Sequence, residues 1–305
     1  MGKISMFGIS GSGKTCYLYA MAQILQGGAK QDDFRLSIIA NDLQQQARLN
    51  EGYLQMAAGG RWPDGTSVTT EYDLCVRVQY DGMYRPIIPS LTLYDYKGGV
   101  WTSTTEDSSR DRQELMNSFA QSSSVIFLVD GTTLLQAMDD ADLNPIHRNR
   151  ALTDVVAARQ QISFVENLFT SFKQKTGSIA PVMVVITKSD VFADAEELLK
   201  GKELIKYYLP SIFAKGSGID SAITNVSLGT HLGSEKGTIT GTLSLSTQYN
   251  IHLPIVYALY AYLSEAYPNS PRDEQLEIEK WAQPLRAMMK GKVDLFNNGY
   301  PVIAC

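Results

Sequence analysis

One short segment constrains the fold of this chain more than any other. Residues Gly8–Thr15 read GISGSGKT, follow a mostly apolar run at residues 3–7, and precede apolar residues at helical spacing from Tyr17 to Leu25. This order predicts a strand, a glycine-rich loop and a helix, which is the context that the pattern G-x-x-x-x-G-K-[ST] requires. The segment is therefore expected to place a phosphate-binding loop (P-loop) after one strand of an α/β sheet.

The chemistry of this loop predicts a nucleoside triphosphate with Mg²⁺. Glycines let consecutive backbone N–H groups, from about Gly11 to Thr15, point inward at a helix N-terminus, where they bind anions. Lys14 is expected to reach the β and γ phosphates, and the hydroxyl of Thr15 to coordinate Mg²⁺. The alternative is a glycine-rich turn that only joins a strand to a helix. The expected phosphate-site residues are Gly8, Ser10, Gly11, Ser12, Gly13, Lys14, Thr15 and Cys16.

Further along the chain, short apolar runs alternate with helical segments. Strands are expected at residues 34–40, 72–80, 90–94, 125–129, 182–186 and 222–227, and helices at 41–58 and 253–263. This alternation is typical of a mostly parallel sheet with helices on both faces. We expect a three-layer α/β fold of the P-loop NTPase type over residues 1–268, with an insertion at about 34–70 and a loop or hairpin at about 229–250. A C-terminal helical extension is expected at 269–305, with its helix at 272–289.

A metal ligand and two nucleotide-sensing loops are expected between residues 60 and 100. Residues 91–95 read LTLYD, an apolar strand that ends in Asp95, which can present a carboxylate to the metal beside the P-loop. Gly98 completes the pattern Asp-x-x-Gly, and a backbone amide there can contact the γ phosphate. A second loop should supply a threonine; Thr66 is the first choice, and Thr69 and Thr70 are rivals. The expected catalytic residues are Lys14, Thr66 and Gly98, and the expected metal ligands are Thr15, Asp95 and Thr66.

Residues 182–190 read VMVVITKSD, an apolar strand followed directly by the pattern T-K-x-D at Thr187, Lys188 and Asp190. Here the chain resembles P-loop GTPases of the Ras-like and translation-factor superclass, which carry [NT]-K-x-D at this position. The resemblance implies that Asp190 accepts hydrogen bonds from guanine N1 and N2 and that Lys188 packs over the base. A carboxylate can accept from two adjacent donors together, and adenine offers no such pair. The alternative is that Asp190 caps a helix after the strand.

The resemblance extends in motif order over about residues 1–263, and it implies the remaining parts of a guanine site. A Ser-Ala-Lys-like loop that contacts the guanine oxygen is matched loosely at residues 226–229, which assigns Ser227 and Leu228 to it. The insertion and the Gly and Thr-rich segment before His252 resemble bacterial Ras-like GTPase domains of multi-component systems. Members of the superclass often carry Gln directly after Asp-x-x-Gly to orient the attacking water, whereas this chain has Gly99. Slow or partner-stimulated hydrolysis is the expected consequence.

Composition excludes several other classes of function. The net charge of −5 offers no basic surface for nucleic acid, and no apolar run is long enough for a membrane span. Three scattered cysteines and the absence of a signal peptide favour a cytoplasmic protein. Three functions stay open: a switch that hydrolyses GTP to GDP and is read by a protein partner or effector, an ATPase, and a nucleotide-loaded scaffold that does not hydrolyse.

Overall fold

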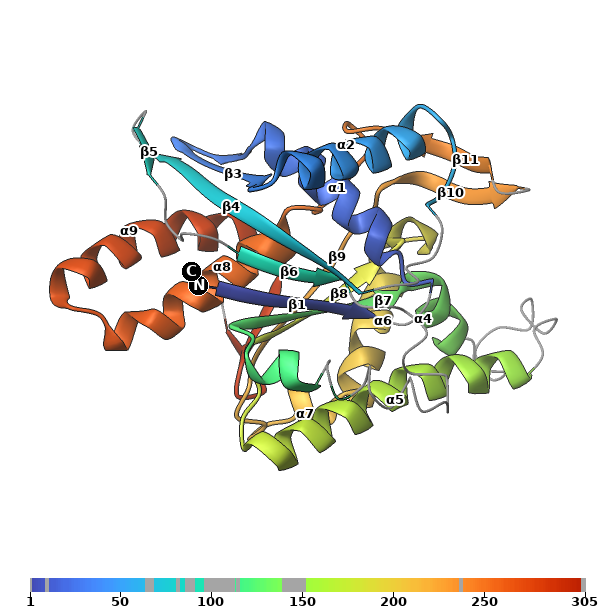
Figure 1. Cartoon of the computed structure of the whole chain (residues 1–305). Coiled ribbons are helices and arrows are strands. Elements are labelled where there is room, and N and C mark those ends of the chain that lie inside the picture. Colours follow the sequence, from blue (N-terminus) through green and yellow to red (C-terminus); the bar gives the residue numbers. More distant parts are fainter. Residues whose placement is uncertain are drawn as a thin grey trace.

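The computed structural model describes residues 2–8, 11–63, 69–80, 83–85, 91–95, 113, 116–138, 152–235 and 238–302. In this part of the chain, one sheet of eleven strands runs through the molecule (Figure 1), in the order β13-β12-β9-β8-β7-β1-β6-β4-β3-β2 with β5 paired to β4. The central strands are β1 (Gly2–Gly8), β6 (Leu91–Asp95), β7 (Ser124–Asp130), β8 (Val182–Thr187) and β9 (Asp220–Asn225). The flanking strands are β2 (Ala29–Gln31), β3 (Phe34–Ala40), β4 (Thr70–Tyr80), β5 (Met83–Arg85), β12 (Asp294–Asn297) and β13 (Tyr300–Val302).

The centre of the sheet is parallel and both sides are antiparallel. Strand β1 pairs in parallel with β6 and β7, and β8 pairs in parallel with β7 and β9. The chain passes from β6 on one side of β1 to β7 on the other, so the strand order reverses beside β1. In open α/β sheets, ligands bind outside the carboxyl ends of the strands at such a switch point. The topology therefore places a candidate site at the ends of β1, β7 and β8.

Helices cover both faces of this sheet, as Figure 1 shows. The helices of one face are α1 (Lys14–Gly27), α2 (Leu43–Ala57), α8 (Leu253–Ala266) and α9 (Arg272–Met289). The helices of the other face are α4 (Gly131–Met138), α5 (Leu152–Thr176), α6 (Ala195–Tyr208) and α7 (Pro210–Phe213). Two short 3₁₀ helices, η3 (Ser189–Val191) and η4 (Tyr267–Asn269), and a separate hairpin of β10 (Gly229–Glu235) and β11 (Thr238–Leu243) complete the described elements.

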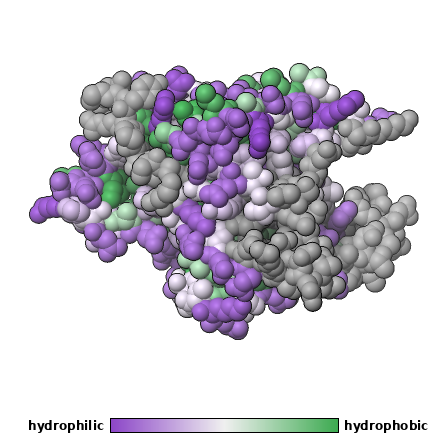
Figure 2. Space-filling view, viewed as in Figure 1, coloured by the Kyte–Doolittle hydropathy of each residue, from purple (hydrophilic) through white to green (hydrophobic). Residues whose placement is uncertain are grey.

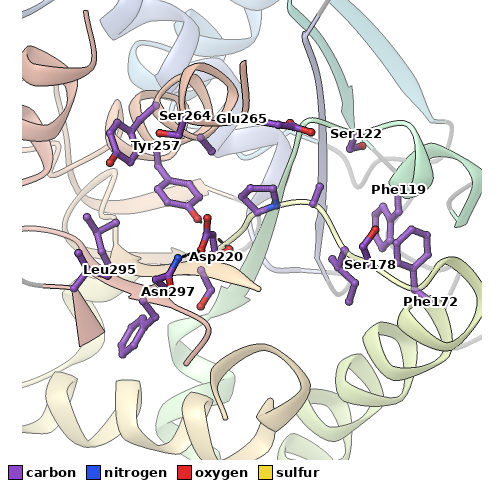
Figure 3. Close-up of a pocket in the computed structure, with 18 of the residues that line it drawn as sticks. Phe119, Ser122, Phe172, Ser178, Asp220, Tyr257, Ser264, Glu265, Leu295 and Asn297 are labelled. Carbon is purple, nitrogen blue, oxygen red and sulfur yellow. Dashed lines mark hydrogen bonds between the residues drawn. The ribbon is translucent and has the colours of Figure 1, made fainter. Parts of the chain in front are cut away.

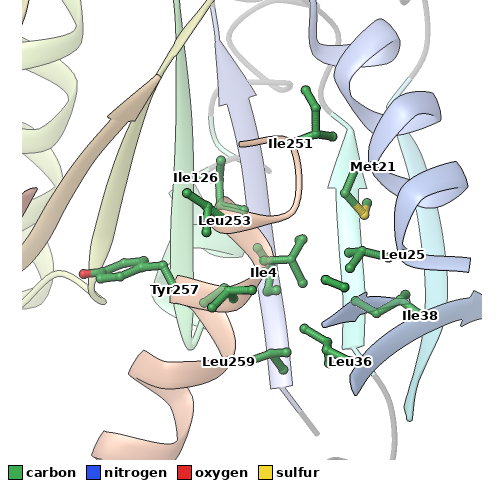
Figure 4. Packing of buried hydrophobic residues seen from close by; sticks show 14 of the residues in the cluster. Ile4, Met21, Leu25, Leu36, Ile38, Ile126, Ile251, Leu253, Tyr257 and Leu259 are labelled. Carbon is green, nitrogen blue, oxygen red and sulfur yellow. The ribbon is translucent and has the colours of Figure 1, made fainter. Parts of the chain in front are cut away.

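The continuous apolar runs of the central strands contribute side chains to two hydrophobic cores, one on each face of the sheet. In β7, Ile126 and Leu128 pack into the core under α1 and α8, while Val125 and Phe127 pack into the core under α5. Figure 4 shows the first core, where Ile126 lies among side chains of β1 and α8. Successive side chains of a strand point to opposite faces, so only a strand that is covered on both sides needs an uninterrupted apolar sequence. This confirms the expected three-layer α/β fold.

Most expected elements are present, and the differences lie in short strands. The segment expected as a loop or hairpin at about 229–250 contains the β10–β11 hairpin, and the expected C-terminal helix is α9. Strands β12 and β13 were not predicted, although β12 pairs antiparallel with β9 and so extends the main sheet. They have four and three residues, and β13 contains Pro301. Such strands are too short to show periodicity, and proline within a run argues against a central strand.

The face shown in Figure 2 is mostly hydrophilic where it is coloured, with small hydrophobic patches. Among the described residues, no helix combines the length and the apolar character needed to cross a bilayer.

Candidate functional site

The P-loop joins the end of β1 to the start of α1. Gly11 and Gly13 have φ angles of 83° and 78°, in the left-handed region that glycine adopts without strain. Gly13 is the N-cap of α1, so no N-cap side chain covers the first turn of this helix. A Cβ atom added at either glycine would meet no atom of the described residues within 4 Å. In the described part of the chain, no side chain fills the space beside this helix N-terminus, which suits an anion.

Close packing and buried donors shape the rest of this loop. A Cβ at Gly8 would lie 2.5 Å from Ser12 Oγ and 2.7 Å from the carbonyl oxygen of Leu128, so this position has no room for a side chain. The Lys14 side chain is buried, and its Nζ donates a hydrogen bond to the Gly8 carbonyl at 2.9 Å. Ser12 Oγ is also buried and has no hydrogen-bond partner among the described residues. A cationic group and an unsatisfied hydroxyl thus lie in one loop, a donor set that fits a polyphosphate.

The other predicted phosphate and metal residues are placed only in part. Thr15 and Cys16 lie in the first turn of α1, and Asp95 ends β6, where it is opposite Met6 of β1. Ser10, Thr66 and Gly98 lie outside the described residues, and so does the side chain of Asp95. Of the rival threonines, Thr70 begins β4 and pairs with Asp95, and Thr69 immediately precedes that strand. In the described part of the chain, His, Cys, Asp and Glu side chains form no group of three that could hold a metal.

The T-K-x-D segment is bound directly to the P-loop. Thr187 is the last residue of β8 and its side chain is buried. Its Oγ1 lies 2.8 Å from the Ser12 carbonyl oxygen and 3.1 Å from that of Val129. A threonine hydroxyl has a single proton, so the two carbonyl groups share this donor. The contact holds the T-K-x-D segment and the P-loop at the same end of the sheet, although 175 residues separate them in sequence.

Lys188 forms an ion pair that the sequence analysis missed. Its Nζ lies 2.6 Å from Asp130 Oδ2, and Asp130 Oδ1 accepts a hydrogen bond from the Thr132 amide at 2.8 Å. The lysine side chain is 45% exposed, so the pair contributes at most about 1 kcal/mol to stability. Asp130 closes an apolar strand, which is the same signal that nominated Asp95. The same signal, applied to residues 124–130, would have identified Asp130 as a candidate site residue.

The carboxylate of Asp190 accepts hydrogen bonds from two later segments. Its Oδ1 lies 3.1 Å from Ser227 Oγ, and its Oδ2 accepts from the Leu232 amide at 3.0 Å. The alternative that Asp190 caps a helix is wrong, because the N-cap of α6 is Asp194, which accepts from the Glu197 amide. Ser227 therefore lies beside Asp190, and Leu228 packs against the core under α8, while their expected contact with the guanine oxygen stays a prediction.

A cavity of about 940 Å³ lies at the opposite end of the sheet (Figure 3). It is lined by residues around the starts of β8 and β9 and by α8. Asp220 accepts a hydrogen bond from Asn297 Nδ2 at 2.7 Å, and the Tyr257 hydroxyl donates to the Asp220 carbonyl at 3.3 Å. The expected site residues are absent from its lining, so this cavity is separate from the candidate site.

A match to a family model identifies the family of this chain. The model described as Double-GTPase 1 matches residues 5–198, which include the P-loop, Asp95 and the T-K-x-D segment. The chain belongs to the Double-GTPase 1 family. The match covers more than half of the sequence, and membership of the family supports binding of guanine nucleotide.

The remaining comparisons add little to the Double-GTPase 1 assignment. No curated protein matches the sequence. A crystal structure of a mutational variant of SsGBP matches with a TM-score of 0.34 and 12% sequence identity, over 74% of this chain and 50% of that chain. This chain therefore spans about half the length of that protein, and at this similarity the match supports no inference about function.

Proposed function

We propose that this Double-GTPase 1 family member binds GTP with Mg²⁺ and hydrolyses it to GDP, as a switch of the Ras-like and translation-factor superclass. The observation that carries the proposal is the joined pair of loops at the switch point. The Thr187 hydroxyl connects the base-reading segment to the P-loop, and the Asp190 carboxylate lies at the end of the same strand. The P-loop follows β1 and the T-K-x-D segment follows β8, and only β7 lies between these two strands. A phosphate site and a base site this close together suit one bound nucleotide.

The chain's own residues divide the work of binding the phosphates. Backbone amides from Gly11 to Thr15 contact the phosphate oxygens, and Lys14 exchanges the Gly8 carbonyl for the β and γ phosphates. The Thr15 hydroxyl, Asp95 and Thr66 would hold Mg²⁺, which neutralises phosphate charge when bound. The Gly98 amide contacts the γ phosphate, so that its loop distinguishes GTP from GDP.

The base is recognised at the end of β8. Asp190 accepts from guanine N1 and N2, Lys188 packs over the ring, and residues Ser227 and Leu228 lie at the guanine oxygen. Adenine lacks the adjacent pair of donors that a carboxylate accepts, so recognition of the base by Asp190 would disfavour the ATPase alternative. A cytoplasmic setting is part of the proposal, supported by the small number of cysteines, three in the whole chain.

A second candidate function is favoured by one feature of the sequence. Gly99 stands where superclass members often carry the glutamine that orients the attacking water. A protein partner or effector that reads the nucleotide-sensing loops could supply this group. Without such a partner, the chain would act as a GTP-loaded scaffold. Single-turnover phosphate release distinguishes the two: release that matches the Lys14→Ala variant, with and without cell extract, favours the scaffold.

Base recognition is tested by measuring the affinities for GTP and ATP with calorimetry. We expect the wild-type protein to prefer GTP, and Asp190→Asn to lower the GTP affinity by about 100-fold, because an amide cannot accept from both donors. Asp194→Asn is the matched control, since it removes a nearby carboxylate where asparagine caps a helix equally well. Equal affinities for GTP and ATP, unchanged by Asp190→Asn, would reject the proposed function.

A further inference from the structure

The β10–β11 hairpin contains a bulge opposite Gly241. Thr230 pairs with Thr242 and Gly233 with Thr240, so two residues of β10, His231 and Leu232, lie opposite Gly241 alone. A bulge of this kind bends a strand and re-aims its backbone groups. His231 has a φ angle of 52°, which is uncommon for a residue with a side chain. A Cβ at Gly241 would lie 2.3 Å from the His231 carbonyl oxygen, so the bulge requires glycine there.

The bulge directs one backbone amide at the carboxylate of Asp190. The Leu232 N–H donates to Asp190 Oδ2 at 3.0 Å. Ser227 is the other donor near this carboxylate, but its single proton is shared between Asp190 Oδ1 at 3.1 Å and the Gly229 carbonyl oxygen at 2.5 Å. Since the hydroxyl proton can satisfy only one acceptor well, the amide of Leu232 is the steadier of the two contacts.

The hairpin that carries this amide is anchored at a place away from Asp190. The indole N–H of Trp62 donates to the Gly233 carbonyl at 3.1 Å, and the Ile239 amide donates to the Gly60 carbonyl at 2.7 Å. Arg61 and Thr238 form an isolated β-bridge in the same region. These contacts attach both strands of the hairpin to the segment after α2. The position of the Leu232 amide is therefore set by the protein before a base arrives.

From these contacts we infer that the β10–β11 bulge is a specificity element, and that the Leu232 amide holds the Asp190 carboxylate in the orientation that reads guanine. A carboxylate has about four acceptor sites, two on each oxygen. With Leu232 on one site of Oδ2 and Ser227 beside Oδ1, each oxygen keeps a site for one of guanine's two adjacent donors. Fixing the carboxylate in advance lowers the entropy cost of binding. The inference rests on the proposed function, because it concerns the same base site.

The test compares GTP with ITP, whose base lacks the 2-amino donor of guanine. If both carboxylate oxygens are held toward the base, the wild-type protein binds GTP more tightly than ITP. Leu232→Pro removes the amide proton, and we expect it to lower the ratio of GTP to ITP affinity by about tenfold. Leu232→Ala keeps the amide proton and should retain the wild-type ratio. A hairpin that only supports the fold would lower both affinities together and leave the ratio unchanged.

A second variant guards against misfolding of Leu232→Pro. Replacing Leu232 with its α-hydroxy acid keeps the side chain and converts the amide to an ester without a donor. An unchanged ratio of GTP to ITP affinity in this ester variant overturns the inference. In that case, a preference of the wild-type protein for GTP over ATP still supports the proposed function. A wild-type protein that prefers GTP to ATP but binds ITP equally well overturns the inference and the assigned contact between Asp190 and guanine N2, while binding of GTP itself still stands. Equal wild-type binding of GTP and ATP overturns both.

Discussion

Tyr17 lies directly behind the P-loop, in the first turns of α1, and is fully buried. Its hydroxyl has no hydrogen-bond partner among the residues that the structure describes, and burial raises the pKa of this group well above its ordinary value. Burying an unpaired hydroxyl costs free energy, because the group has lost its bonds to water without replacement. This residue therefore carries a stability cost that the apolar part of its ring offsets.

Removing the Tyr17 hydroxyl should stabilise the protein. We expect Tyr17→Phe to raise the free energy of unfolding by about 1 kcal/mol, measured by urea denaturation. Tyr53 is the matched control, because its hydroxyl accepts a hydrogen bond from Gln248 Nε2 at 3.1 Å. Tyr53→Phe should lower the free energy of unfolding by about 1 kcal/mol. A destabilised Tyr17→Phe variant would show that the hydroxyl has a partner.

Residue-scale expectations were most successful where a short pattern carries the chemistry. The spacing of Gly8, Gly13 and Lys14 predicted a loop between a strand and a helix, and the structure confirms that arrangement. The ion pair between Asp130 and Lys188 was missed, although an acid at the end of an apolar strand was available as a signal. The roles of all the expected site residues stay predictions, and Ser10, Thr66 and Gly98 also lie outside the described residues.

At the scale of single elements, the hairpin depends on its glycine more than on its strand residues. β11 is mostly exposed and contributes little apolar burial. The shape of the hairpin depends on the close approach of its two strands at Gly241. Gly241 has a φ angle of 86° and lies against the His231 carbonyl, so both its conformation and its lack of a side chain are required.

A comparison of two glycines separates these requirements. Gly216 also has a positive φ, of 84°, but a Cβ there would meet no atom of the described chain within 4 Å. We expect Gly216→Ala to cost about 1 kcal/mol from backbone strain alone, and Gly241→Ala to cost more because a backbone oxygen cannot move aside. Hydrogen exchange is the measurement: Gly241→Ala should accelerate exchange of β10 and β11 amides. Slow hairpin exchange in Gly241→Ala would contradict the requirement for glycine.

At the scale of the whole molecule, the C-terminal strands complete the sheet. β12 pairs with β9, the outermost parallel strand, and Leu295 and Val293 are buried in the core beneath α8 and α9. The Thr224 hydroxyl also donates to the Lys292 carbonyl at 3.0 Å. Without these residues, β9 would present an unpaired edge, which is a site for non-native pairing.

Truncation after Gly291 should therefore weaken the entire fold. We expect a loss of about 4 kcal/mol in the free energy of unfolding, from the burial of Val293 and Leu295 alone, and a tendency to aggregate. Truncation after Val302 is the control, because it keeps β12 and β13. Thermal unfolding and light scattering measure both effects. Equal midpoints for the two truncated proteins would show that β12 does not support the sheet.

The sequence by itself determined the local elements, because a strand, a loop and a helix each leave a pattern within a few neighbouring residues. The P-loop and the strands that feed both cores were predictable for this reason. Tertiary structure alone decided which loops meet: Asp130 and Lys188 are 58 residues apart, and Asp190 and Leu232 are 42 apart. These contacts depend on the order of strands in the sheet and on one bulge in a hairpin. No local pattern encodes them, since the free energy that selects strand order comes from packing across the whole sheet.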